Sequence, residues 1–261
     1  MIEARKALLD ALEAIGHHRE SMILAGAQAI YLQTPNFDSP VEGATRDADL
    51  TIDKDLLKAD PLLDVVLTSN GFKLVDPPGR WETPDGVIVD LMVPAALVPR
   101  DGRSVEMNPH SKLTARRTKG IEGCLVDNTI MRINSLDAVD RRSFDIRVAK
   151  PSALLIAKLH KVNDRINDRN ASPNKDAHDI YRLLAATNEV EFRIGLHNLL
   201  NNDISESVAL EGLEILKTLF AKSLDSVGNT MAASATEGFG IYKNVQNSSY
   251  LLSKDLIGKI M

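Results

Sequence analysis

Short stretches of apolar residues, each bounded by glycine, proline or polar residues, follow one another through the first 150 positions of the chain. Stretches of about four to eight such residues are typical of strands buried on one or both faces. The pair Asp85-Gly86 between two of them predicts a tight hairpin turn, which makes the two flanking strands antiparallel. The strands expected on this basis are 22–25, a strand beginning near Asp47, 80–83, 87–93, 129–133 and 144–148.

Apolar residues recur at helical spacing at the start of the chain and again throughout its second half. Residues 2–15 and 27–32 predict helices in the first half. Pro151 suits the first turn of a helix, and no strand candidate of comparable strength lies beyond it. The helices expected there are 154–162, 174–187, 189–201, 205–224 and 247–260. The pattern therefore predicts an α/β domain with a mixed sheet and flanking helices over residues 1–150, followed by an α-helical domain over residues 151–261.

The composition, with 44% hydrophobic and 26% charged residues, is typical of a globular protein. No stretch approaches the roughly 18 consecutive apolar residues that a membrane span needs, and the charged N-terminal helix is unlike a signal peptide. Cys124 is the only cysteine, which excludes an intramolecular disulfide and a thiolate metal cluster. We therefore expect a cytoplasmic protein that does not act in a membrane.

The net charge of −5 conceals an asymmetry along the chain. Residues 100–175 contain 16 Lys and Arg against 9 Asp and Glu, a local charge of +7, so the remainder carries −12. A basic segment attracts phosphate-rich ligands whatever the total charge of the protein. The same count would also arise from charges spread over a solvated surface, so composition leaves both interpretations open.

The chemistry of the chain is indicated first by the acids of two expected strands. Asp47 and Asp49 alternate on one strand and therefore point to the same face. Asp90 lies within the apolar stretch 87–93, where a lone carboxylate is costly unless it finds a cation or a hydrogen-bond donor. Because neighbouring carboxylates repel each other unless a divalent cation lies between them, these three acids predict a Mg²⁺ site of the kind that handles nucleoside triphosphates.

A glycine at a strand–helix junction precedes these acids. In Leu24-Ala25-Gly26-Ala27 the glycine allows backbone N–H groups to approach a phosphate. Alone this feature indicates only tight packing of a helix on a strand. Combined with the acids, it favours a nucleotide–metal site.

A second cluster lies in the helical half. Lys158 and Arg165 are seven residues apart and share a helix face, and Asp176 and Asp179 share a face of the next helix. The structural interpretation is an inter-helix salt bridge that contributes little to stability. The functional one has Lys158 binding triphosphate oxygens, with Asp176 orienting it or assisting proton transfer. Spacing alone does not separate the two.

Taken together, these features resemble the polymerase-beta-like nucleotidyltransferase superfamily, and within it the AbiEii/AbiGii-type nucleotidyltransferase toxins, including the MenT group. The matching segments extend over roughly residues 20 to 185 and keep the family order. They are Leu24-Ala25-Gly26-Ala27-Gln28-Ala29-Ile30, Thr45-Arg46-Asp47-Ala48-Asp49-Leu50, Leu154-Leu155-Ile156-Ala157-Lys158-Leu159 with Arg165, and Lys175-Asp176-Ala177-His178-Asp179-Ile180.

The resemblance implies a nucleotidyltransferase-like fold whose helical domain closes over the nucleotide. It also implies roles for individual residues: Asp47, Asp49, Lys158 and Asp176 are catalytic, Asp47 and Asp49 hold Mg²⁺ (or Mn²⁺) with Asp90 as a third ligand, and Gly26, Ala27, Thr45, Lys158 and Arg165 bind the nucleotide. The chain departs from the family at two positions. The family usually has Gly or Ser at the position of Ala27, and an arginine at the position of Gly43.

Three functions remain open at this point. The resemblance favours the toxin of a bacterial toxin–antitoxin or phage-defence system, which transfers nucleotides from a nucleoside triphosphate to tRNA or another RNA and has a cognate antitoxin protein. The alternatives are a nucleotidyltransferase acting on a small molecule or a protein, and a non-catalytic nucleotide-binding module.

If the acceptor is an RNA end, the basic segment 112–120 is expected to be a loop that holds its phosphates beside the metal site. Replacing Arg116, Arg117 and Lys119 together should then weaken RNA binding and leave triphosphate binding largely unchanged.

Overall fold

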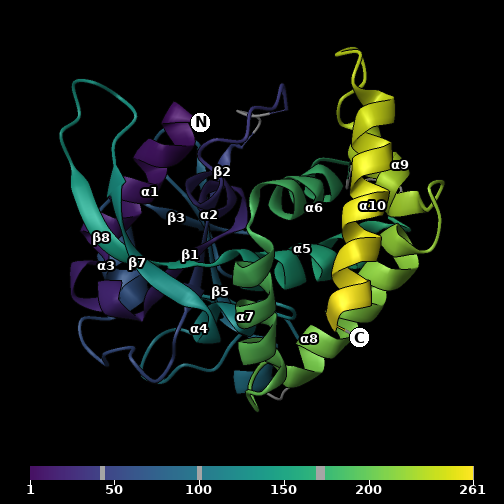
Figure 1. Cartoon of the computed structure of the whole chain (residues 1–261). Coiled ribbons are helices and arrows are strands. Elements are labelled where there is room, and N and C mark those ends of the chain that lie inside the picture. Colours follow the sequence, from purple (N-terminus) through teal and green to yellow (C-terminus); the bar gives the residue numbers. More distant parts are fainter. Residues whose placement is uncertain (42–44, 99–101, 169–173, 261) are drawn as a thin grey trace.

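An eight-stranded mixed sheet occupies the first half of the chain, and helices form the second half (Figure 1). The computed structural model describes residues 1–41, 45–98, 102–168 and 174–260. The strands are β1 (Met22–Ala25), β2 (Asp47–Ile52), β3 (Lys73–Val75), β4 (Arg80–Glu82), β5 (Ile88–Pro94), β6 (Arg116–Thr118), β7 (Asn128–Asn134) and β8 (Ser143–Ala149). They follow the order β3-β4-β5-β2-β1-β8-β7, and β6 pairs with β5.

The register of the central strands places the acids. β2 is antiparallel to β1 and parallel to β5. Asp49 therefore stands opposite Ala25 on one side and opposite Asp90 on the other. Since paired residues of adjacent strands point to the same face, Asp49 and Asp90 share a face of the sheet.

Helices of the first half border the sheet. These are α1 (Ile2–Ala14), α2 (Gly26–Gln33), α3 (Leu63–Ser69) and α4 (Gly123–Val126), with short 3₁₀ segments η1 (Gly16–Ser21) and η2 (Ala95–Leu97). α1 packs against β2, β5 and β8, and α2 packs against β1 and β2. The alternate residues of β2, Ala48, Leu50 and Ile52, are completely buried.

The described part of the second half contains helices joined by short connections, and no strand. Its helices are α5 (Pro151–Arg165), α6 (Asn174–Ala186), α7 (Glu189–Leu200), α8 (Glu206–Leu216), α9 (Val227–Ser234) and α10 (Tyr242–Ile260), with a π-helical turn η3 (Lys217–Ala221). α5 is the central element, because it contacts α2, α4, α6, α7 and α8. The buried hydrophobic side chains form one cluster that extends from α1 to α10.

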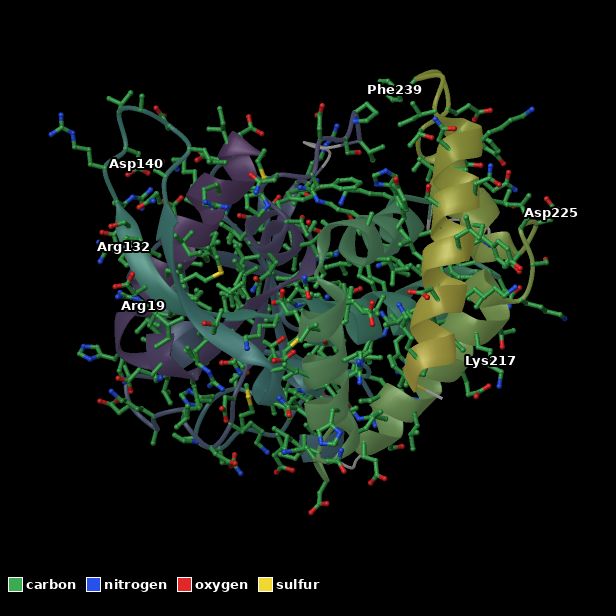
Figure 2. All side chains as sticks on the ribbon, in the orientation of Figure 1. Arg19, Arg132, Asp140, Lys217, Asp225 and Phe239 are labelled. Carbon is green, nitrogen blue, oxygen red and sulfur yellow. The ribbon has the colours of Figure 1, made fainter. Side chains whose placement is uncertain are left out.

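Charged side chains project from the periphery of both halves (Figure 2). Arg132 and Asp140 belong to the β7–β8 hairpin, and Lys217 and Asp225 to the helical half. Among the described residues, no helix combines the length and the apolar character needed to cross a bilayer.

The expected α/β class with a mixed sheet is confirmed, and two local expectations are wrong. The segment 112–120 is not wholly a loop, because Arg116–Thr118 pairs in parallel with β5 as β6. The expected helix 205–224 ends its regular part at Leu216, after which η3 widens the turn. β6 lacks an apolar alternation and is a strand only because the end of β5 offers it a partner.

Candidate functional site

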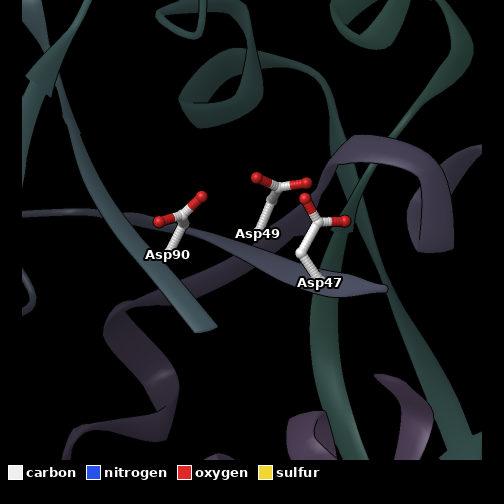
Figure 3. A group of neighbouring side chains, drawn as sticks. All are labelled: Asp47, Asp49 and Asp90. Atoms are coloured by element: carbon white, nitrogen blue, oxygen red, sulfur yellow. The ribbon is translucent and has the colours of Figure 1, made fainter. Parts of the chain in front are cut away.

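Three carboxylates meet on one face of the sheet (Figure 3). Asp47 and Asp49 are alternate residues of β2, and Asp90 is the β5 residue in register with Asp49. One carboxylate oxygen of each residue lies within 4.8 Å of one oxygen of the other two. The sheet register thus brings together acids that are about forty residues apart in the sequence.

Asp47 and Asp49 carry charges that the described part of the chain does not pair. Neither carboxylate has a hydrogen-bond or ion-pair partner among the described residues. Burial, and then the negative charge of Asp47, raise the pKa of Asp49 to about 6, against a smaller opposing effect of Lys161. Two neighbouring carboxylates without cationic partners form an arrangement that a divalent cation stabilises, and carboxylate oxygens are the ligands that Mg²⁺ prefers. The residues present therefore fit such a cation.

Asp90 differs from the other two acids because it already has cationic partners. Its Oδ1 accepts hydrogen bonds from Arg116 Nη1 at 2.5 Å and from Arg80 Nε at 3.4 Å. Burial alone would raise the pKa of Asp90, but the hydrogen bond and charge of Arg116, with the charge of Arg80, hold it below its usual value. Asp90 is therefore ionised and shared between the acid cluster and two arginines.

Gly26 fixes the approach of α2 to the acids. Its φ of +65° lies in the left-handed region, and a Cβ at this position would overlap the carboxylate of Asp49. Only glycine therefore allows the β1–α2 turn to pack directly on Asp49. As a result, the N-terminus of α2, with its free backbone N–H groups, begins beside the acids.

Gln28 ties the acid-bearing strand to its surroundings. Its Nε2 donates to the carbonyl oxygens of Asp47 at 3.1 Å and Ala4 at 2.9 Å, and its Oε1 accepts from Arg5 Nε at 3.0 Å. Gln28 is nearly inaccessible to solvent. It therefore connects β2, α1 and α2 at the point where the site begins.

The acids line a cavity of about 460 Å³ between the sheet and α5. Basic side chains make up much of the remaining wall and come from two directions. One set belongs to α5 and the other to the β4–β6 side of the sheet. They are Lys158, Lys161 and Arg165 on α5, and Arg80, Arg103, Arg116, Arg117 and Lys119 on the other side. A cavity with acids at its centre and cations around them suits a polyanion that binds together with a metal ion.

Lys158 lies at the cavity wall, but its ammonium group is ion-paired with two carboxylates of α6. Its Nζ is 2.6 Å from Asp176 Oδ1 and 2.7 Å from Asp179 Oδ2. Burial alone would lower the pKa of Lys158, but these two carboxylates raise it above its usual value. Conversely, the charges of Lys158 and Lys161 hold the pKa of Asp176 below its usual value despite burial. Asp176 is therefore a firmly ionised anchor for the cations of α5.

The structure places the expected site residues in two groups. Asp47, Asp49, Asp90, Gly26, Lys158 and Arg165 line the cavity. Asp176, Ala27 and Thr45 are not part of the cavity wall. Asp176 lies behind Lys158, and the buried Thr45 donates its hydroxyl to Tyr31 Oη at 3.4 Å. Gly43, at a position where the resembling family often has an arginine, lies outside the described residues.

Asp176 does not line the cavity, and its contacts with Lys158, Lys161 and Arg165 favour its ionised form. Its expected part in proton transfer stays a prediction. Four residues of the site were not anticipated from the sequence. Lys161 carried a signal, since it lies one helical turn after Lys158. Arg80 and Arg103 carried none, because their positions depend on strand pairing and loop packing, and the contacts of Gln28 depend on how α2 packs on α1 and β2.

Comparison with family models, curated proteins and solved structures gave no match. The functional conclusion therefore depends on the fold and on the arrangement of the site.

Proposed function

We propose that this protein is a metal-dependent nucleotidyltransferase. The observation that carries the proposal is the pair of unpaired carboxylates, Asp47 and Asp49, facing a cation-lined cavity with Asp90 beside them. The resemblance of four ordered sequence segments to nucleotidyltransferase toxins supports the same function, and one of these segments contains Asp47 and Asp49.

In the proposed reaction a hydroxyl oxygen of the acceptor forms a bond to the α-phosphorus of a nucleoside triphosphate, and the bond from that phosphorus to the β-phosphate oxygen breaks, releasing pyrophosphate. Asp47 and Asp49, with Asp90, would hold Mg²⁺ or Mn²⁺, which supplies charge neutralisation at the phosphates and lowers the pKa of the hydroxyl. Lys161 and Arg165 bind the outer phosphates from α5. The hydroxyl proton leaves to solvent, because Asp90 would hold the metal ion and its pKa lies below its usual value.

We propose RNA, and tRNA in particular, as the acceptor. The cations of the cavity come from two parts of the fold, α5 and the β4–β6 side of the sheet, and one set is enough for a triphosphate. The second set, Arg103, Arg117 and Lys119 among them, suits the phosphates that flank a reacting RNA hydroxyl. With the resemblance, this makes the protein the toxin of a bacterial toxin–antitoxin or phage-defence pair, with an antitoxin protein as its partner.

Incubation with α-labelled nucleoside triphosphates, Mg²⁺ and total RNA tests the proposal. Label should enter RNA with the wild type and not with Asp47→Asn. Label on protein or on a small molecule would contradict RNA as the acceptor and identify the acceptor as the labelled molecule. Absence of transfer to any acceptor would contradict the enzymatic function. Growth arrest on expression, relieved by a co-encoded protein, tests the toxin assignment separately.

A further inference from the structure

Arg116 occupies a constrained position beside the acids. It begins β6, in register with Met92 of β5, and its guanidinium reaches back to Asp90. Gly79, at a φ of +78°, packs so closely on this point that a Cβ would overlap the backbone nitrogen of Arg116 and the carbonyl oxygen of Leu91. The backbone of Arg116 is therefore held in place, while its side chain, 20% exposed, borders the cavity.

The charge of Arg116 is balanced by all three acids. Burial alone would lower its pKa, but Asp90, followed by Asp49 and Asp47, raises it above its usual value. Arg116 is thus the counter-ion of the acid cluster in the metal-free protein. Without it, three carboxylates within 4.8 Å of one another would face one cavity with only the weaker, more exposed contact of Arg80 to Asp90.

We infer that Arg116 competes with the metal ion for Asp90 and transfers to the phosphates of the nucleotide when the metal binds. This inference rests on the proposed function, because it requires a cation among the acids. A divalent cation beside Asp90 repels a guanidinium. The displaced side chain then finds an anion within the same cavity, and its planar fork of donors matches phosphate oxygens. Arg116 is accordingly a positioning residue that links metal binding to nucleotide binding.

Arg117 provides a matched control. It carries the same charge, follows Arg116 directly in β6 and lines the same cavity. Its Nε donates to the carbonyl oxygen of Val98 at 3.0 Å, however, and it makes no contact with Asp90 within the described residues. Loss of Arg117 removes a positive charge from the cavity without removing the competitor.

The experiment is a titration of the full chain with Mn²⁺ alone, followed by a titration with a non-hydrolysable nucleoside triphosphate at saturating Mn²⁺. Arg116→Gln should bind Mn²⁺ about tenfold more tightly than the wild type and the nucleotide about tenfold more weakly. Arg117→Gln should change Mn²⁺ affinity by less than about threefold, because its charge acts only through the screened field. In an Asp90→Asn background the effect of Arg116→Gln on Mn²⁺ should largely vanish.

Unchanged or weaker Mn²⁺ binding by Arg116→Gln would overturn the inference, since a merely structural role lowers both affinities together. If Arg116→Gln fails to fold, Arg116→Lys is the second variant, because it retains the positive charge and lacks the planar guanidinium donors. It should keep Mn²⁺ affinity within about threefold of the wild type and bind nucleotide several-fold more weakly, and unchanged nucleotide binding would overturn the inference. A wild type that binds no Mn²⁺ would instead overturn the proposed function itself, and this inference with it.

Discussion

Asp49 combines three features that rarely occur together on one side chain. It is packed against the turn of Gly26, it stands in register with Asp90, and it has no cationic partner among the described residues. A partly buried carboxylate without a partner lowers the stability of the folded state. Such a cost is typical of a residue retained for binding or catalysis.

Asp49→Asn should therefore stabilise the metal-free protein and weaken its cation binding. Removing the charge relieves the repulsion by Asp47 and the cost of burial, so the free energy of unfolding should rise by roughly 1 kcal/mol in the absence of metal. Denaturant unfolding with EDTA measures this quantity. Asp53→Asn is the control, because Asp53 is ion-paired with Arg147 and should lose stability when neutralised.

Cation binding should strengthen as pH rises from about 5 to 7 and level off above that. The reason is that burial and Asp47 raise the pKa of Asp49 to about 6, above its ordinary 3.8, so its carboxylate must first lose a proton. Mn²⁺ titrations at several pH values check this. In Asp47→Asn the rise should shift to lower pH, and a pH-independent affinity in the wild type would contradict the assignment of Asp49 as a ligand.

At the scale of elements, the α5–α6 pair holds the cationic wall of the cavity in place. Lys158, Asp176 and Asp179 are all buried, whereas Lys161 is one-third exposed and contacts Asp176 at 3.3 Å. Lys158 and Lys161 share a face of α5 and differ in burial and in the contacts that are open to them. Lys158 is buried between the two helices, whereas Lys161 lines the cavity from a partly exposed position, where it can contact a ligand.

Lys158→Met should cost about 3–5 kcal/mol of unfolding free energy, because it leaves two buried carboxylates without their main partner. Lys161→Met should cost less than about 1 kcal/mol, as expected for a partly exposed pair, and should still reduce nucleotide affinity. Denaturant unfolding and nucleotide titration separate the two effects. If Lys161→Met destabilised the protein as much as Lys158→Met, the division between anchor and ligand contact would be wrong.

The elements also show which parts of the site the sequence could predict. Alternation within one strand was enough to place Asp47 and Asp49 together. Helical spacing placed Lys158 and Asp176 on two successive helices but did not decide what their contact does. The ion pair between Asp90 and Arg116 could not be predicted from the sequence, because it depends on β6, a three-residue strand with no apolar pattern of its own. The burial of Asp176 behind Lys158 likewise depends on how α6 packs on α5.

For the whole molecule, a network of polar contacts fixes the helical half to the sheet half. Arg182 of α6 donates from Nε to Thr34 Oγ1 at 2.6 Å and from Nη2 to the Thr34 carbonyl at 2.8 Å, at the end of α2. His178 of α6 lies 3.3 Å from Ser39 Oγ in the segment that follows α2. Since α2 begins at Gly26, this network joins α6 to the element that packs on Asp49.

His178 should make the whole fold sensitive to acid. Burial lowers its pKa to about 4, below the ordinary value of 6.5. As pH falls below 6.5, His178 becomes protonated in the unfolded chain, whereas in the folded protein it stays neutral until about pH 4. The free energy of unfolding therefore falls across this window, by roughly 2–3 kcal/mol from this residue. Thermal unfolding between pH 7 and 4.5 measures the slope. His178→Asn should flatten it, and an unchanged slope would show that His178 does not set it.

The most direct test of the central claim is the transfer reaction itself, followed with α-labelled and γ-labelled nucleoside triphosphates side by side in Mg²⁺ and RNA. The proposed function predicts that label from the α-position enters the acceptor, that label from the γ-position appears in pyrophosphate, and that Asp49→Asn abolishes both. Transfer of the γ-label to an acceptor, or equal α-labelling by wild type and Asp49→Asn, would contradict a nucleotidyltransferase whose chemistry depends on the β2 carboxylates.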